Sequence, residues 1–137
     1  MDTIQIEKDI PVFGMQVKTF PNGVSEVFQK LLATVPGGFT RSYYGISYMD
    51  DKGKMVYIAA AAEKESGEAE KYKMERYIIE KGEYAAEKLA NWRDNIDCIK
   101  DVFQGMMYNT RIDRTKPAVE WYNNDEEMFC MVKMIQK

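Results

Sequence analysis

The sequence contains no histidine, so it lacks the commonest general base and the commonest transition-metal ligand of proteins. Catalytic triads built on histidine are excluded, and any chemistry must use carboxylates, tyrosine, lysine or cysteine. Cysteine is scarce, with only Cys98 and Cys130, and neither has metal-ligand spacing. We interpret both as buried thiols of a protein in the reducing cytosol rather than as a disulfide. We expect no metal and no cofactor.

An excess of positive charge is also missing. The chain has 19 Lys and Arg against 22 Asp and Glu, a net charge of −3. Nucleic acids and anionic membranes are bound by clustered Lys and Arg, so we expect neither partner. The segment 1–7 carries acidic residues where a signal peptide has a basic and then an apolar region. No apolar run approaches the length of a membrane span. We therefore expect one cytoplasmic domain over residues 1–137.

Apolar residues recur at spacings of three and four in two segments, which predicts amphipathic helices over residues 24–35 and 94–108. Asp94 is the expected N-cap of the second helix, and Asn22 or Ser25 that of the first. The acidic segment 64–70 has no apolar face and is expected to be an exposed loop. Alternating or β-branched stretches predict strands at 10–20, 40–49, 54–63, 72–79, 84–89, 118–122 and 128–135. The alternative for 84–89 is a helix, because AAEKL at 85–89 is also good helix sequence.

The order strand, helix, strand, strand occurs twice in this assignment. Two such halves can join their strands into one antiparallel sheet with both helices on the same side, which is an α+β layout. We therefore predict an α+β fold of duplicated strand-helix-strand-strand halves with pseudo-twofold symmetry. A central cleft between the two halves is a natural place for a ligand.

Glu120 is a lone carboxylate inside an otherwise apolar strand. By alternation Ala118, Glu120 and Tyr122 share one face, and Val119 and Trp121 share the other. We expect the helices to pack on Val119 and Trp121, which leaves Glu120 and Tyr122 for the cleft. A carboxylate in a dry aromatic site attracts a cation strongly, because water screens the charge weakly there. The alternative is that Glu120 lies on a solvated face of the sheet.

Four tyrosines fall on one predicted hairpin, and aromatic faces attract cations and stack on flat ligands. Alternation places Tyr43 on one face and Tyr44 and Tyr48 on the other, and does not decide which face lines the cleft. Tyr57 follows on the return strand. The alternative is that these are half-buried strand aromatics, as β-propensity predicts. Trp92 precedes the second helix and either caps the pocket or packs against the helix as a hydrophobic staple.

Three short motifs, taken in order, resemble a known family. They are RSYYGISY at 41–48 followed by YIAA at 57–60, IIEKGEYA at 78–85, and AVEWY at 118–122 before a polar turn and a final apolar strand. Together they resemble the GyrI-like small-molecule-binding domain. This effector-binding domain is attached to several multidrug-responsive transcription regulators and also occurs alone. The resemblance covers nearly the whole chain. The sequence does not include the helix-turn-helix segment that the regulators carry before this domain.

The resemblance implies a duplicated fold and a central aromatic pocket whose acidic residue meets flat, hydrophobic cations. Glu120 stands at the position of that acid. We accordingly predict a stand-alone domain that binds hydrophobic, cationic or aromatic compounds and has no catalytic residue. Some family members act as hydrolases of electrophilic compounds, and others are thought to inhibit a larger protein, so both remain alternatives. The predicted ligand-binding residues are Glu120, Tyr122, Tyr43, Tyr48, Tyr57 and Trp92.

Overall fold

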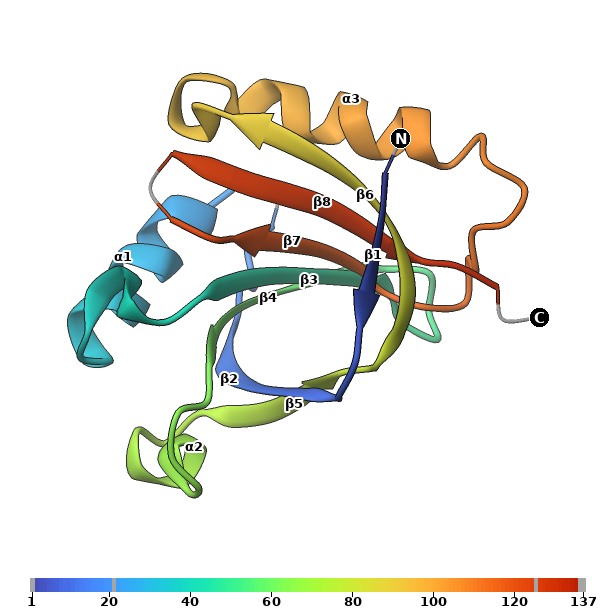
Figure 1. Cartoon of the computed structure of the whole chain (residues 1–137). Helices are drawn as coiled ribbons and strands as arrows, with labels where there is room; N and C mark the ends of the chain where they lie inside the picture. The colour runs from blue at the N-terminus through green and yellow to red at the C-terminus, as the bar shows by residue number, and fades with distance from the viewer. Residues whose placement is uncertain (1, 21, 125, 136–137) are drawn as a thin grey trace.

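Eight antiparallel strands form one strongly curled sheet in the order β1-β6-β8-β7-β3-β4-β2-β5 (Figure 1). This computed structural model describes residues 2–20, 22–124 and 126–135, except for the side chain of Phe39. The strands are β1 Asp2–Ile6, β2 Ile10–Gln16, β3 Tyr43–Met49, β4 Met55–Ala62, β5 Glu75–Ile79, β6 Gly82–Ala90, β7 Ala118–Tyr122 and β8 Glu127–Lys133. The helices are α1 Val24–Thr34, α2 Glu68–Lys71 and α3 Ile96–Met106, with short 3-10 turns η1 Gly38–Thr40 and η2 Trp92–Asp94.

The sheet has the symmetry expected of two equivalent halves. From one edge the strand order is β1-β6-β8-β7, and from the other edge it is β5-β2-β4-β3, so β1 to β4 correspond in order to β5 to β8. Matched elements also agree in length: β1 and β5 have five residues each, and α1 and α3 have eleven. At the centre β3 pairs with β7, and Gly45 lies opposite Glu120. The predicted duplicated α+β fold is confirmed. The first half begins with one more strand than expected, β1, which pairs along β6.

Helices α1 and α3 lie on the same face of the sheet, as predicted. α1 packs on β4 and β2, and α3 packs on β8 and β6. Leu31 from α1 and Val35, the C-cap residue that follows it, share one buried cluster with Ile99 and Met106 from α3. Burial of each such side chain contributes about 1.5–3 kcal/mol, which anchors the helices without side-chain caps. The central strands β3 and β7 are left between the two helices.

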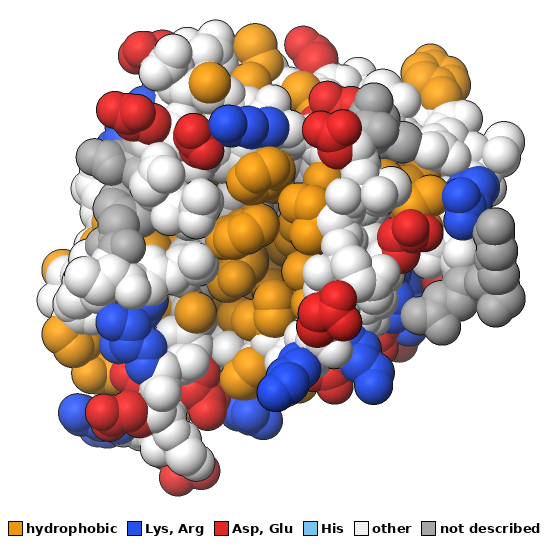
Figure 2. All heavy atoms as spheres, in the orientation of Figure 1, with side chains coloured by type: hydrophobic (Ala, Val, Ile, Leu, Met, Phe, Trp, Pro, Cys, Tyr) orange, Lys and Arg blue, Asp and Glu red, His pale blue; other side chains and the backbone are white. Residues whose placement is uncertain are grey.

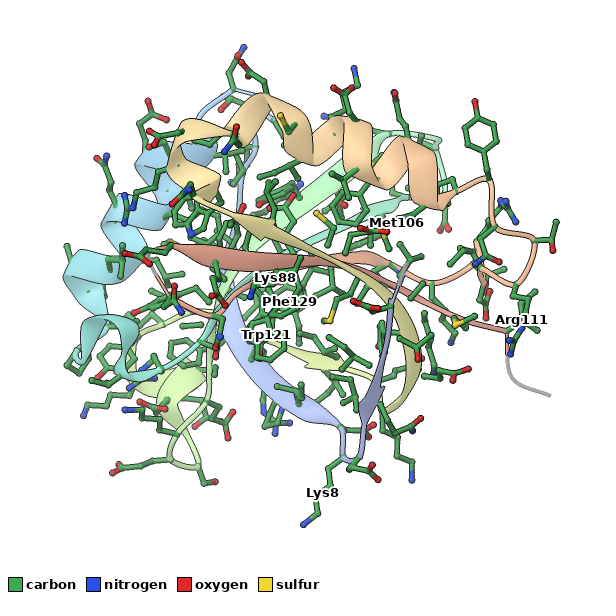
Figure 3. All side chains as sticks on the ribbon, turned by 45° about the horizontal axis from the view of Figure 1, so that its top comes forward. Lys8, Lys88, Met106, Arg111, Trp121 and Phe129 are labelled. Atoms are coloured by element: carbon green, nitrogen blue, oxygen red, sulfur yellow. The ribbon has the colours of Figure 1, made fainter. Side chains whose placement is uncertain are left out.

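The opposite face of the sheet curls inward and carries a second apolar cluster. Val119 and Met131 are buried there, and Trp121 stacks on Phe129 with ring centroids 5.1 Å apart. Figure 2 shows apolar side chains gathered in a hollow bordered by charged ones, and Figure 3 labels Trp121 and Phe129 inside the curl. The prediction that the helices pack on Val119 and Trp121 is wrong. Both faces of this sheet are apolar, so alternation separates two sets of side chains without identifying the set under the helices.

Three local predictions are corrected by the structure. α3 begins after Asn95, and Asp94 belongs to η2 instead of capping the helix. Gly23 occupies the N-cap of α1, with no side-chain cap bond from its neighbours. Both cysteines are free, as expected, but Cys98 is exposed and only Cys130 is buried.

In the described part of the chain, the helices are too short or too polar to cross a membrane.

Only the first part of the acidic segment 64–70 is an exposed loop: residues 64–67 are exposed, whereas Glu68 is buried where α2 begins. Both carboxylate oxygens of Glu68 accept hydrogen bonds from the guanidinium of Arg41, at 3.1 and 3.0 Å. Two backbone N–H groups, of Lys64 and Glu65, donate to the same carboxylate. This buried ion pair ties α2 to the start of β3, a long-range contact that local composition does not reveal.

Candidate functional site

A cavity of about 340 Å³ opens between α1 and the start of α3, and we call it the interhelical cavity. Its volume is in the range of small-molecule pockets, and its walls are mainly apolar, as such pockets usually are. Tyr43 from β3 and Tyr122 from β7, the two strands left between the helices, contribute to its floor. The full lining is Val24, Ser25, Phe28, Gln29, Leu32, Tyr43, Trp92, Arg93, Ile96 and Tyr122.

A carboxylate with two tyrosine partners lies next to this floor. The hydroxyls of Tyr57 and Tyr122 both donate to Oε1 of Glu120, at 2.6 and 2.7 Å. Such short bonds to a carboxylate are among the stronger hydrogen bonds of proteins. Tyr122 lines the interhelical cavity, whereas Glu120 does not, so the Tyr122 hydroxyl links the cavity to the acid. No cationic side chain pairs with Glu120 anywhere in residues 2–20, 22–124 or 126–135.

Gly45 provides the space in which these groups meet. It lies opposite Glu120 on the neighbouring strand, and a Cβ there would stand 2.1 Å from the Tyr57 hydroxyl and 2.6 Å from Glu120 Oε1. Any side chain at this position would therefore displace one or both groups. A glycine inside a strand pattern is the sequence signal for such a close approach, but sequence alone does not indicate what approaches it.

Burial affects the protonation of Glu120 and of its two tyrosine partners. It raises the pKa of Glu120, and the hydrogen bonds from Tyr57 and Tyr122 offset part of the increase. Burial and the charge of Glu120 also raise the pKa of both tyrosines, which therefore stay protonated and act as donors. On β8, burial and the same charge raise the pKa of Cys130 to about 12, so its thiol is unreactive. The described residues contain no cluster that could hold a metal ion.

An aromatic frame holds the tyrosines in place. Phe20 stacks on Tyr57, with ring centroids 4.9 Å apart, and Phe28 meets both tyrosine rings edge-on. Trp92 meets Tyr122 edge-on at 4.8 Å. Edge-to-face pairs of this kind stabilise beyond simple burial. Phe20 and Phe28 are missing from the predicted site because their spacing is that of ordinary core positions.

The structure brings Glu120, Tyr122, Tyr43, Tyr57 and Trp92 together on the face of the sheet that carries the helices. Tyr48 lies apart. It points to the other face of β3, pairs with β4 near the hairpin turn, and is 39% exposed. Tyr48 is therefore not part of the predicted cluster. Alternation puts Tyr43 and Tyr48 on opposite faces of β3, and the sequence alone did not decide which of these faces lines the cleft. Trp92 lines the cavity, in agreement with the first of its two interpretations.

A smaller cavity of about 250 Å³ lies on the opposite face of the sheet, against Ile46 and Val119. The acidic residue in its lining, Glu80, is already paired, because it lies 3.1 and 3.0 Å from the amines of Lys116 and Lys133. It therefore lacks the unpaired acid that marks the interhelical side.

A substitution tests the pKa of Glu120. A group whose folded pKa is raised stabilises the fold fully below its unfolded pKa, and the contribution is lost as the pH rises through the folded pKa. Glu120→Gln lacks this titration, so its stability relative to the wild type should increase from about pH 4.5 towards pH 7. Urea unfolding of both proteins across this range measures the difference. A difference that stays constant with pH would contradict the raised pKa.

This protein resembles known proteins in its fold and not in its sequence. No family model and no curated protein sequence matches it. An integron cassette protein from the mobile metagenome of Vibrio cholerae has a similar structure, with a TM-score of 0.70 and 13% identity over 97% of this chain and 94% of that one. A protein named SAV2435, solved with bound tetraphenylphosphonium, has a TM-score of 0.68 and 15% identity, covering 96% of this chain and 93% of that one.

A putative transcription regulation protein from Staphylococcus aureus MU50 is similar over 96% of this chain and 97% of its own, with 13% identity and a TM-score of 0.61. At identities this low the likeness concerns the backbone alone. The chain therefore shares its fold, over almost the full length of each protein, with the chain that binds tetraphenylphosphonium and with those from Vibrio cholerae and Staphylococcus aureus.

Proposed function

We propose that this protein binds flat, hydrophobic organic cations in the interhelical cavity, in order to sense or sequester them. The observation that carries the proposal is Glu120, a buried carboxylate that two tyrosines hold beside an aromatic cavity and that no described side-chain cation neutralises. A buried charge without a counter-ion is costly. A ligand that supplies the missing positive charge removes that cost, so the site favours cations over neutral compounds of the same shape.

The lining of the cavity suits the rest of such a ligand. Tyr43, Tyr122, Trp92 and Phe28 offer aromatic surface, which attracts both flat rings and cations. The Tyr122 hydroxyl, which donates to Glu120 at 2.7 Å, connects the carboxylate to the cavity wall, and burial leaves the charge of Glu120 weakly screened. The likeness to SAV2435 supports the proposal, because that protein was solved with a phosphonium cation that carries four phenyl groups.

Glu120→Gln tests the proposal, since it keeps the shape and an acceptor oxygen and removes the charge. A charge-assisted contact contributes about 1.5–3 kcal/mol, so affinity for a cationic dye should fall roughly ten- to a hundredfold. Suitable probes are an N-methyl dimethylaminostyrylpyridinium dye and its uncharged pyridine parent, titrated by calorimetry. The neutral parent should lose much less affinity. Glu70→Gln is the matched control, because it removes one exposed acid from α2.

Three results would contradict the proposal. If the dyes do not bind the wild type, the cavity is not a site for such ligands. If Glu120→Gln weakens both dyes equally, the substitution disturbs packing and Glu120 is a structural residue. Mass spectrometry of an electrophilic ester probe recovered after incubation distinguishes a binder from a hydrolase, because a binder returns it unchanged. Conversion that depends on Glu120 would support the alternative in which this carboxylate activates water.

A further inference from the structure

Arg93 brings a positive charge to the edge of the interhelical cavity. Its side chain is exposed and lines the cavity, and its guanidinium carbon lies 4.7 Å from the centre of the Trp92 ring. Trp92 meets Tyr122 edge-on, and Tyr122 donates to Glu120. A continuous path of contacts thus runs from a cation at the exposed edge to a carboxylate behind the floor. Within the described ranges, Arg93 makes no ion pair.

The backbone around Arg93 fixes this arrangement. Asn91 has a left-handed φ of 52° and turns the chain into η2. The Trp92 indole N–H donates to the Asn124 carbonyl at 3.0 Å, and the Trp92 backbone N–H donates to the Glu126 carbonyl at 3.2 Å. These two bonds clamp the indole to the turn between β7 and β8. The ring face beneath Arg93 is therefore pre-oriented, and the guanidinium needs little ordering to stack on it.

Opposite charges therefore flank the cavity, with Arg93 at its edge and Glu120 behind its floor, where Tyr122 donates to it. Arg93 repels a simple cation at the entrance and covers one face of Trp92, an aromatic surface that a cationic ligand could otherwise use. A ligand that carries a carboxylate beside its cationic ring system meets attraction at both ends. Arginine is suited to this task, because its planar fork matches the geometry of a carboxylate.

We propose that Arg93 makes the interhelical cavity selective for zwitterionic aromatic compounds, with the cationic ring system directed towards Glu120 and an anionic group held at the entrance. This inference rests on the proposed function and adds a ligand class to it. It assigns Arg93 as a specificity-determining residue, and it predicts that an esterified ligand, which keeps the cation and loses the anion, binds less well.

The test compares one styrylpyridinium dye that carries an N-carboxypropyl group with its methyl ester, by fluorescence titration. In the wild type the acid should bind more tightly than the ester. Arg93→Gln should weaken the acid and strengthen the ester, so that the preference falls by about two- to fivefold. Arg93→Lys keeps the charge and should retain most of the preference. Arg111→Gln, which removes an equal charge far from the cavity (Figure 3), should leave it unchanged.

The outcomes separate this inference from the proposed function. If both dyes bind and Arg93→Gln leaves their ratio unchanged, the role of Arg93 is overturned while the cation site stands. If neither dye binds the wild type, the proposed function fails and the inference fails with it. Salt gives a second readout, because about 1 M salt shortens the screening length to about 3 Å. The preference should then shrink in the wild type and in Arg93→Lys, but not in Arg93→Gln.

Discussion

Glu68→Gln should lower the free energy of unfolding by about 3–5 kcal/mol, the cost of breaking a buried ion pair by removing one partner. The side chains of Arg41 and Glu68 are only 4% and 9% exposed. Arg41 also donates to the Ala62 carbonyl at 3.1 Å, so its guanidinium is held in place and cannot turn to solvent when its partner loses the charge. Urea unfolding at neutral pH measures the loss.

The pH dependence of the free energy of unfolding, measured at acidic pH, provides a second test of the Arg41–Glu68 ion pair. Burial opposes ionisation of Glu68, but hydrogen bonds from Arg41, Lys64 and Glu65 outweigh it and lower its pKa to about 2. Its stabilisation is thus complete above the ordinary pKa of 4.5 and is lost as the pH falls from there towards about 2. Wild-type stability should decline over that window, and the Gln variant should lack this component of the decline.

The matched control for this prediction is Glu83→Gln. Glu83 pairs with Arg111 at 3.6 Å, and both side chains are nearly half exposed. Exposed pairs contribute about 0–1 kcal/mol, so this variant should resemble the wild type. A loss in Glu68→Gln no larger than that in Glu83→Gln would mean that the buried pair does not stabilise α2 and the start of β3.

Gly45→Ala should reduce cation affinity about a hundredfold, at the upper end of the loss expected for removal of a charged contact. The added methyl group would overlap the Tyr57 hydroxyl and Oε1 of Glu120, at 2.1 and 2.6 Å. The Tyr57 side chain cannot move aside to make room, because Phe20 stacks on its ring and Phe28 meets the ring edge-on. The carboxylate and its partner must separate, and overpacking should cost about 1–3 kcal/mol of stability. Titration with the cationic styrylpyridinium dye measures the affinity.

Gly105→Ala makes the same chemical change where there is room. Gly105 lies in α3, and a Cβ there meets no atom within 4 Å. Alanine is the better helix former by about 1 kcal/mol, so this variant should be slightly more stable and should bind the dye normally. If Gly45→Ala binds the dye as well as Gly105→Ala does, the contact of Tyr57 with Glu120 is not part of the binding site.

Much of the fold could be predicted because local patterns reflect local physics. Apolar spacing placed both long helices within two residues of their observed ends, and turn residues placed the hairpin of β3 and β4. β1 was missed, since five residues with little apolar character form a strand only when β6 supplies hydrogen-bond partners. α2 was missed for a similar reason: Glu68 is buried only because Arg41, distant in sequence, neutralises it.

The candidate site, like the fold, has features that the sequence predicts and others that depend on tertiary contacts. The sequence by itself determined that Glu120 is a lone acid in an apolar strand, that Tyr122 shares its face, and that no histidine takes part in the chemistry. Only the tertiary structure decided which face the helices cover, that Gly45 lies opposite the carboxylate, and that Tyr57 crosses β3 to reach it. Alternation is a property of one strand, whereas register and the choice of face depend on how distant strands pair and where the helices find apolar surface.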